Sequence, residues 1–175
     1  GFKDTVRFPR RSRYLHRQWP TVTGLGFDVH PLVQGRDLVL GGVSIPHDKG
    51  LYGHSDADVL CHAVADAVLG ALGMGDIGKL FPPEDPGLKG VRSLDLLKEV
   101  QSMISGRAEI THLDCTIVAQ APRLAPYMDD MKENIAGAFL VSSSRVSIKG
   151  VSPENLGSLG RREGIASFCS ATLLK

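Results

Sequence analysis

The residues best suited to chemistry lie in two short segments, Asp28-Val29-His30 and 54–62. In an extended strand, positions i and i+2 point the same way. Asp28 and His30 can therefore converge on one ion, while Val29 is predicted to stay in the core. His62 stands on a predicted helix and could supply a third ligand, which would give a metal site of two histidines and a carboxylate. Such a site leaves one coordination position open, and an open position favours catalysis over a purely structural role.

The same residues also have plain structural interpretations. An Asp-x-His pair can lie on a solvated strand face, and a histidine near a core is often simply hydrogen-bonded there. Ser55 and Asp58 fit the start of a helix, with Ser55 as the N-cap and Asp58 near the positive end of the helix dipole. Capping leaves His54 unexplained and does not exclude a second role for Ser55.

Two further segments have the composition of phosphate-binding turns. They are 149–157 and 159–164, in which glycines flank hydroxyl, carboxyl and guanidinium groups. Backbone N–H groups and arginines in such turns can bind anionic oxygens. Ordinary surface loops look similar, and neither segment matches a nucleotide-binding Gly-rich motif. The residues of interest are Ser152, Glu154, Arg161 and Arg162.

The elements that must position these residues fit one domain, because the chain has 175 residues. Hydrophobic periodicity predicts strands interleaved with three helices, hence a two-layer α/β sandwich with a mixed sheet. A hairpin turn at Gly41-Gly42 would force one antiparallel pair. We predict strands over 21–30, 36–40, 43–46, 110–120, 144–149 and 165–174, helices over 55–72, 93–104 and 126–140, and an irregular loop over 73–90.

Charge separates the beginning of the chain from the rest. Residues 1–20 hold six basic side chains and one acidic one, whereas residues 21–175 hold 14 basic and 18 acidic ones. A net negative body argues against a nucleic-acid partner, which needs clustered positive charge. The basic segment is predicted to be a tail or linker, a fusion remnant or the remnant of a transit peptide. No stretch approaches the roughly 18 apolar residues of a membrane span, so no membrane partner is expected.

The three cysteines are interpreted as buried thiols in a reducing compartment. Cys61, Cys115 and Cys169 lie in apolar stretches and form no C-x-x-C pair. We therefore expect a cytoplasmic protein. A plastid or apicoplast location is the alternative if residues 1–20 are a transit remnant.

Six motifs, taken jointly, carry a resemblance to a known enzyme family. From Gly24 to the C-terminus the chain resembles the 2-C-methyl-D-erythritol 2,4-cyclodiphosphate synthase family, the cyclases of the non-mevalonate isoprenoid pathway. The motifs occur in family order: G-x-G-F-D-V-H, G-G-V-x-I-P, G-H-S-D-A-D-V-x-x-H, D-I-G-K-L-F-P, A-Q-A-P and G-R-R-E-G-I-A.

The resemblance implies a phosphorus–oxygen lyase reaction. The substrate would be 4-diphosphocytidyl-2-C-methyl-D-erythritol 2-phosphate, whose 2-phosphate attacks its own β-phosphate and releases CMP. The protein then needs no nucleophile and acts by folding the substrate and neutralising charge. The resemblance implies zinc on Asp28, His30 and His62, and magnesium or manganese on Glu154.

The resemblance also implies residue roles around the substrate. His54 and Ser152 are expected as catalytic residues near the phosphates. Pro83, Arg123 and the run 151–154 depart from the commoner family pattern, which leaves Asp85 as the better carboxylate beside the substrate. The implied substrate contacts are Asp28, His30, His54, Ser55, Asp76, Ile77, Gly78, Phe81, Asp85, Gln120, Ala121, Pro122, Arg123, Leu124, Ala125, Ser152 and Arg161.

The implied assembly is a homotrimer of the 21–175 domain with active sites between subunits. A cytidylyltransferase is the implied fused or associated partner. Two rival hypotheses remain at this point. Two histidines and a carboxylate also bind iron in non-haem oxygenases, although those usually begin His-x-Asp. The alternative is a metal-stabilised trimeric module that binds cytidine nucleotides without turnover.

Overall fold

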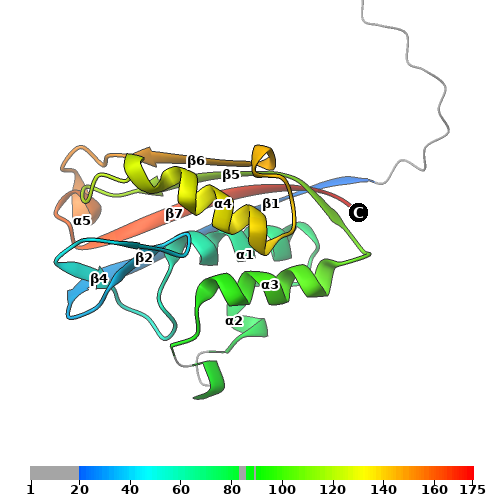
Figure 1. Ribbon diagram of the computed structural model, residues 1–175, viewed down its shortest axis with the longest axis horizontal. Coiled ribbons are helices and arrows are strands. Elements are labelled where there is room, and N and C mark those ends of the chain that lie inside the picture. The colour runs from blue at the N-terminus through cyan, green and yellow to red at the C-terminus, as the bar shows by residue number, and fades with distance from the viewer. Residues whose placement is uncertain (1–19, 83–85, 89) are drawn as a thin grey trace, which may run out of the picture.

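The computed structural model describes residues 20–82, 86–88 and 90–175. Its main sheet contains the strands β1 (Thr21–Gln34), β4 (Lys49–Leu51), β5 (Glu109–Val118), β6 (Val146–Val151) and β7 (Gly164–Leu174). They lie in the order β4-β1-β7-β5-β6 (Figure 1). Neighbours are antiparallel except for β5 and β6, which are parallel. The predicted mixed sheet is confirmed.

Three longer helices cover one face of this sheet (Figure 1). They are α1 (Val59–Ala71), α3 (Ser93–Ile104) and α4 (Met128–Ala138). Helices α1 and α4 pack on the sheet and α3 packs against both of them. The predicted two-layer α/β arrangement is therefore confirmed. Shorter pieces are α2 (Ile77–Leu80), α5 (Gly157–Gly160) and the single turns Pro86–Leu88, Ala125–Tyr127 and Ser143–Arg145.

The glycine-pair hairpin forms as predicted, but it does not belong to the main sheet. Strands β2 (Leu38–Leu40) and β3 (Val43–Ile45) pair with each other in a separate two-stranded sheet. Gly41 has φ +56° and Gly42 has φ +71°, which is what a two-residue hairpin turn of this twist requires. The antiparallel pairs of the main sheet therefore come from β1, β4, β5 and β7, not from this turn.

Strand β1 and helix α1 approach each other backbone to backbone. A Cβ added at Gly26 would lie 1.9 Å from the carbonyl oxygen of Ala63, and one at Gly24 would lie 2.0 Å from that of Ala67. No side chain fits at either glycine, and the close approach brings the first turns of α1 beside the middle of β1. This packing places the helix ligand within reach of the strand ligands.

The two faces of β1 are used differently from the prediction. The glycines, Asp28 and His30 face α1, whereas the apolar side chains between them point to the other face of the sheet. Val29 is 48% exposed and Phe27 is 49% exposed, so the expectation that Val29 lies in the core is wrong. Leu25 and Phe168 are exposed on the same face, and the Phe27 and Phe168 rings lie 4.7 Å apart. A single chain thus leaves an apolar sheet face uncovered.

Several local expectations need correction. Segment 73–90, predicted to be irregular, contains α2 and the 86–88 turn. The N-cap of α1 is Asp58, whose carboxylate accepts from the backbone N–H groups of Leu60 and Cys61 at 3.1 Å. Ser55, the predicted cap, instead accepts from the N–H of Ala57 inside the preceding turn. Strand β4 was not predicted.

The three cysteines are confirmed as buried free thiols. Among the described residues, no helix is long and apolar enough to cross a membrane. The basic segment 1–19 lies outside the described residues.

Candidate active site

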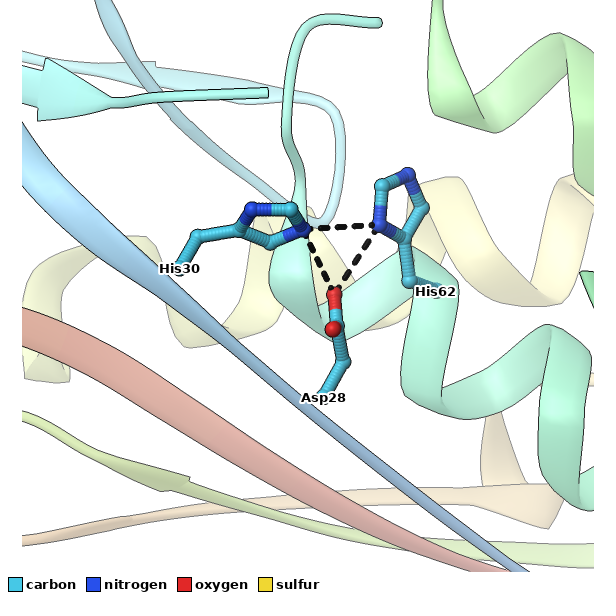
Figure 2. Close-up of side chains that lie close together, drawn as sticks. All are labelled: Asp28, His30 and His62. Atoms are coloured by element: carbon cyan, nitrogen blue, oxygen red, sulfur yellow. Dashed lines mark hydrogen bonds and ion pairs between the residues drawn. The ribbon is translucent and has the colours of Figure 1, made fainter. Parts of the chain in front are cut away.

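Three predicted metal ligands meet at the interface of β1 and α1 (Figure 2). Oδ2 of Asp28 lies 2.9 Å from Nε2 of His30 and 2.9 Å from Nδ1 of His62. The two ring nitrogens are 3.3 Å apart. All three donor atoms therefore turn toward one point, from side chains that are mostly buried.

The electrostatics of this cluster are those of a carboxylate held between two imidazoles. Burial alone would raise the pKa of Asp28, but the close contacts with the His30 and His62 rings hold it well below its usual value. The hydrogen bond to Asp28 raises the pKa of His30 above its ordinary value. Asp28 is therefore ionised across the physiological range, as a metal ligand must be.

The donor set fits a divalent metal. Tetrahedral zinc with bonds of about 2.0–2.1 Å needs ligand atoms about 3.3 Å apart. The observed separations of 2.9–3.3 Å need only a slight expansion to reach that value. The outer nitrogens are engaged as well: Nδ1 of His30 donates to the Tyr52 carbonyl at 2.8 Å, and Nε2 of His62 lies 3.0 Å from Oγ of Ser93. Partners of this kind orient metal-binding histidines.

A cavity of about 220 Å³ opens beside the triad. It brings together predicted residues from distant parts of the chain with an apolar wall from α3 and the segment before it. The predicted lining residues found there are His30, His54, Ser55, His62, Ile77, Gly78 and Phe81. Asp76 is the N-cap of α2, where its carboxylate accepts from the N–H of Lys79 at 2.8 Å. Asp85 and Pro83 lie outside the described residues.

The turn that carries His54 is held by a residue that the sequence analysis missed. Arg36 donates from Nη1 to the Gly53 carbonyl at 3.1 Å and from Nη2 to the Ser55 carbonyl at 2.7 Å. The guanidinium group thus binds the backbone on both sides of His54. One available signal was a lone arginine at the edge of an apolar hairpin.

Helix α2 is tied to α1 by a second missed contact. Oδ1 of Asp66 accepts from the Ile77 N–H at 2.7 Å, one helical turn beyond His62. Burial raises the pKa of Asp66, although the bond from Ile77 opposes the rise. The i, i+4, i+8 spacing of Asp58, His62 and Asp66 was a visible signal, but each residue serves a different partner.

Asp58 itself has a structural role at the start of α1. It is fully buried, and burial raises its pKa although backbone N–H groups donate to it. Besides capping α1, its Oδ2 accepts from the Gly42 N–H at 2.7 Å and from the Cys61 thiol at 3.2 Å. The hairpin turn and the metal-bearing helix are therefore joined through this carboxyl group.

A second group of the predicted substrate contacts lines a different cavity, of about 260 Å³, between the β5 end and the β6 end. Ala121 lies within the same segment. Glu154 lies on an exposed turn, where its N–H donates to Oγ of Ser152 at 3.0 Å, and the exposed Arg161 pairs with Glu163 at 2.6 Å. The predicted residues in this cavity are Gln120, Pro122, Arg123, Leu124, Ala125 and Ser152. Within one chain, the metal triad and these residues do not share a cavity among the described residues.

Comparisons with known proteins show which family this chain belongs to. The YgbB family model matches residues 21–174. A 2-C-methyl-D-erythritol 2,4-cyclodiphosphate synthase from Agathobacter rectalis is 51% identical over 152 residues, which cover 85% of this chain and 86% of that protein. The chain belongs to this YgbB family of 2-C-methyl-D-erythritol 2,4-cyclodiphosphate synthases. Membership makes it an enzyme of the non-mevalonate isoprenoid pathway.

Solved structures of the family share its fold. The bifunctional IspDF from Campylobacter jejuni is 40% identical with a TM-score of 0.84, over 88% of this chain and 42% of that chain. A CDP complex of IspF from Plasmodium falciparum is 30% identical with a TM-score of 0.77, over 89% of this chain and 97% of that one. The cyclodiphosphate synthase fold therefore spans β1 to β7 here.

Proposed function

We propose that the chain converts 4-diphosphocytidyl-2-C-methyl-D-erythritol 2-phosphate into the 2,4-cyclodiphosphate and CMP. An oxygen of the 2-phosphate forms a bond to the β-phosphorus while the bond from that phosphorus to the α–β bridging oxygen breaks. CMP leaves with the bridging oxygen. The observation that carries this proposal is the metal-ligand triad beside a cavity lined by His54 and Ser55, in a chain of this family.

The protein acts by positioning, because both reacting groups belong to the substrate. His54 and Ser55 lie on one turn beside the metal cluster, where they can bind oxygens of the attacked phosphate. The Arg36 guanidinium holds that turn through its two hydrogen bonds and adds positive charge near it. Ile77, Gly78 and Phe81 form the facing wall, which we assign to the erythritol part. Folding the substrate between these walls brings the two phosphates together for in-line attack.

Two metal ions fit the donor sets in this chain. Asp28, His30 and His62 would hold zinc, because imidazole and carboxylate in a three-ligand set suit it. Glu154 would hold magnesium or manganese, which needs few protein ligands when phosphates supply the rest. When bound, such ions withdraw electron density from the phosphate oxygens and stabilise the charge of the leaving CMP.

The second cavity is assigned to the cytidine nucleotide. Segment 120–125 and Ser152 line it, and the side chain of Gln120 accepts from the Asn155 N–H at 2.9 Å, which braces the turn that carries Glu154. The Plasmodium falciparum IspF structure is a complex with CDP, which supports a cytidine nucleotide as the ligand class. Arg161 would add positive charge close by.

We assign the assembly as a homotrimer with active sites between subunits. Two observations support it: the uncovered apolar face of Leu25, Phe27, Val29 and Phe168, and the separation of the metal cavity from the nucleotide cavity. A closed cyclic assembly would bury that face three times and set one chain's metal cavity beside the next chain's nucleotide cavity. A fused or associated cytidylyltransferase, as in bifunctional relatives, and a cytoplasmic location complete the assignment.

Phosphorus NMR of the protein with the diphosphocytidyl substrate, zinc and magnesium tests the reaction directly. The expected result is loss of the substrate signals and growth of CMP and cyclic diphosphate signals in equal amounts. Binding of the substrate without any new signal would refute the proposal in favour of a binding module. Oxygen consumption with iron, and no cyclic product, would refute it in favour of an oxygenase.

A further inference from the structure

Two serine hydroxyls lie beside the outer nitrogen of the same metal-ligating histidine. Nε2 of His62 is 3.0 Å from Oγ of Ser93 and 3.2 Å from Oγ of Ser55. The two hydroxyl oxygens are 3.4 Å apart. A ring nitrogen with one hydrogen donates one strong hydrogen bond, so the two serines cannot serve His62 equally.

Asp56 decides which serine accepts that bond. Its two carboxylate oxygens face groups that can only donate: the Ser93 N–H at 3.0 Å from Oδ2 and the Asp58 N–H at 3.3 Å from Oδ1. The Ser93 hydroxyl also contacts Oδ1 of Asp56, and a carboxylate that already accepts from backbone N–H groups accepts here too. The Ser93 hydroxyl hydrogen therefore points to Asp56, and its oxygen lone pairs are left for His62.

This direction of donation determines the tautomer of the His62 imidazole. If Oγ of Ser93 can only accept from His62, the ring hydrogen must be on Nε2. A neutral imidazole with its hydrogen on Nε2 has its lone pair on Nδ1. Nδ1 is the atom that faces Asp28 and His30, which is where a metal would bind (Figure 2).

We propose that Asp56 and Ser93 are positioning residues that hold His62 as a metal ligand through Nδ1, and that they thereby leave the Ser55 hydroxyl hydrogen for a substrate phosphate. This inference rests on the proposed function and deepens it. Oγ of Ser55 accepts from the Ala57 N–H at 3.0 Å with one of its lone pairs, and its hydrogen is not needed by His62. Of the two serines beside Nε2 of His62, Ser93 thus orients the imidazole and Ser55 is available to the substrate.

The surroundings keep the Asp56–Ser93 pair in place. Ser93 is fully buried, and the chain around it is joined to the His54 turn by backbone bonds from Asp56 N–H to the Val91 carbonyl at 3.2 Å and from Gly90 N–H to the His54 carbonyl at 3.1 Å. Because Ser93 is buried, solvent does not easily replace its hydroxyl as the acceptor. The start of α3 is thereby coupled to the geometry of the metal site.

The test compares zinc affinity, measured by competition with a chelator of known affinity, in variants of the two serines. Ser93→Ala should weaken zinc binding by about 10- to 100-fold, which is the usual effect of removing such a partner. Ser93→Thr keeps the hydroxyl and should restore most of the affinity. Ser55→Ala should keep zinc affinity within about twofold of the wild type, by the same scale, and raise KM for the diphosphocytidyl substrate.

Ser102→Ala is the matched control, because Ser102 lies on the same helix and its hydroxyl donates only to the Lys98 carbonyl. It should change neither quantity. A second readout is proton NMR of the zinc-loaded protein. The Nε2 hydrogen of His62 should give an exchange-protected downfield signal that survives in Ser55→Ala and is lost or rapidly exchanging in Ser93→Ala.

These outcomes separate this inference from the proposed function, because the zinc titration needs no substrate. If His62→Ala loses zinc but Ser93→Ala binds it as tightly as the wild type, the Asp56–Ser93 assignment is overturned and the reaction assignment stands. Equal weakening by Ser55→Ala and Ser93→Ala would also overturn it. Unchanged zinc binding in His62→Ala would instead refute the metal site on which both proposals depend.

Discussion

The metal cavity and the nucleotide cavity of this chain are built in opposite ways. At the metal cavity both ligating histidines and the adjacent turn are held by further groups: His30 by Tyr52, His62 by Ser93, and the His54 turn by Arg36. At the nucleotide cavity the lining comes from segment 119–128 and from residues 150–152, and Glu154 stands on an exposed turn. The metal cavity is therefore preorganised within one chain, whereas the nucleotide side is an exposed surface.

This difference shows what a single chain can and cannot complete. A metal site needs donor atoms placed within a few tenths of an ångström, and the packing of β1 on α1 supplies that placement inside one domain. The proposed substrate carries phosphates that we assign to the metal cavity and a cytidine that we assign to the nucleotide cavity, so its binding needs both cavities to face each other. On this account, the uncovered apolar sheet face is the surface that brings them together between chains.

The largest effect is expected at the metal cavity. His62→Ala removes one of three ligands, so the protein should lose most of its bound zinc. Metal stabilisation of phosphate charge is worth several kcal/mol, so turnover should fall by on the order of 10³-fold. Elemental analysis and the phosphorus NMR assay measure the two losses. Full zinc content in this variant would remove the triad from the account.

The next effect lies on the nucleotide side and should leave zinc untouched. Glu154→Gln keeps the shape of the side chain but weakens its attraction for a hard divalent cation. Turnover should fall by about 100-fold, comparable with losing one strong charge-stabilising group, while zinc content stays at the wild-type level. Loss of zinc together with activity would show that the two cavities are not independent.

A smaller effect is expected from the support behind the metal cavity. Arg36→Lys keeps the charge but cannot span the carbonyls of Gly53 and Ser55. Displacement of the His54 turn should lower kcat/KM by about tenfold, which is about one strong hydrogen bond, with zinc retained. Arg145→Lys is the matched control, since Arg145 donates to Glu109 and to the Ile110 carbonyl in another part of the fold. Equal effects of the two changes would remove the special role of Arg36.

The strand part of the triad was predictable because its geometry is local: two-residue spacing on a strand puts Asp28 and His30 on one face. His62 lies 34 residues after Asp28, and it was predicted as a ligand from its side-chain chemistry and from the family motif, not from local spacing. The error at Val29 arose because alternation separates two strand faces without saying which one the helices cover. Gly24 and Gly26 carried that information: glycines in line with Asp28 indicate close backbone approach, and hence the covered face.

The supporting contacts could not be predicted because they join segments far apart in the chain. Ser93 reads locally as a helix cap, yet its hydroxyl bridges Asp56 and His62, more than 30 residues earlier. Arg36 reads as a hairpin residue, yet it grips a turn 17 and 19 residues later. The spacing of residues in a motif gives the ligands of a site but not the tertiary contacts that orient them.

Subunit complementation tests the central claim that one active site takes its metal cavity and its nucleotide cavity from different chains. His62→Ala and Glu154→Ala proteins, each nearly inactive, are unfolded together in equal amounts, refolded and assayed for cyclic diphosphate. If the two residues belong to neighbouring chains, each mixed trimer has one intact site, which is about one site in four over the whole refolded population, and activity returns accordingly. If both residues serve a site within one chain, every site carries a defect, and mixed trimers demonstrated by mass spectrometry would show no recovery.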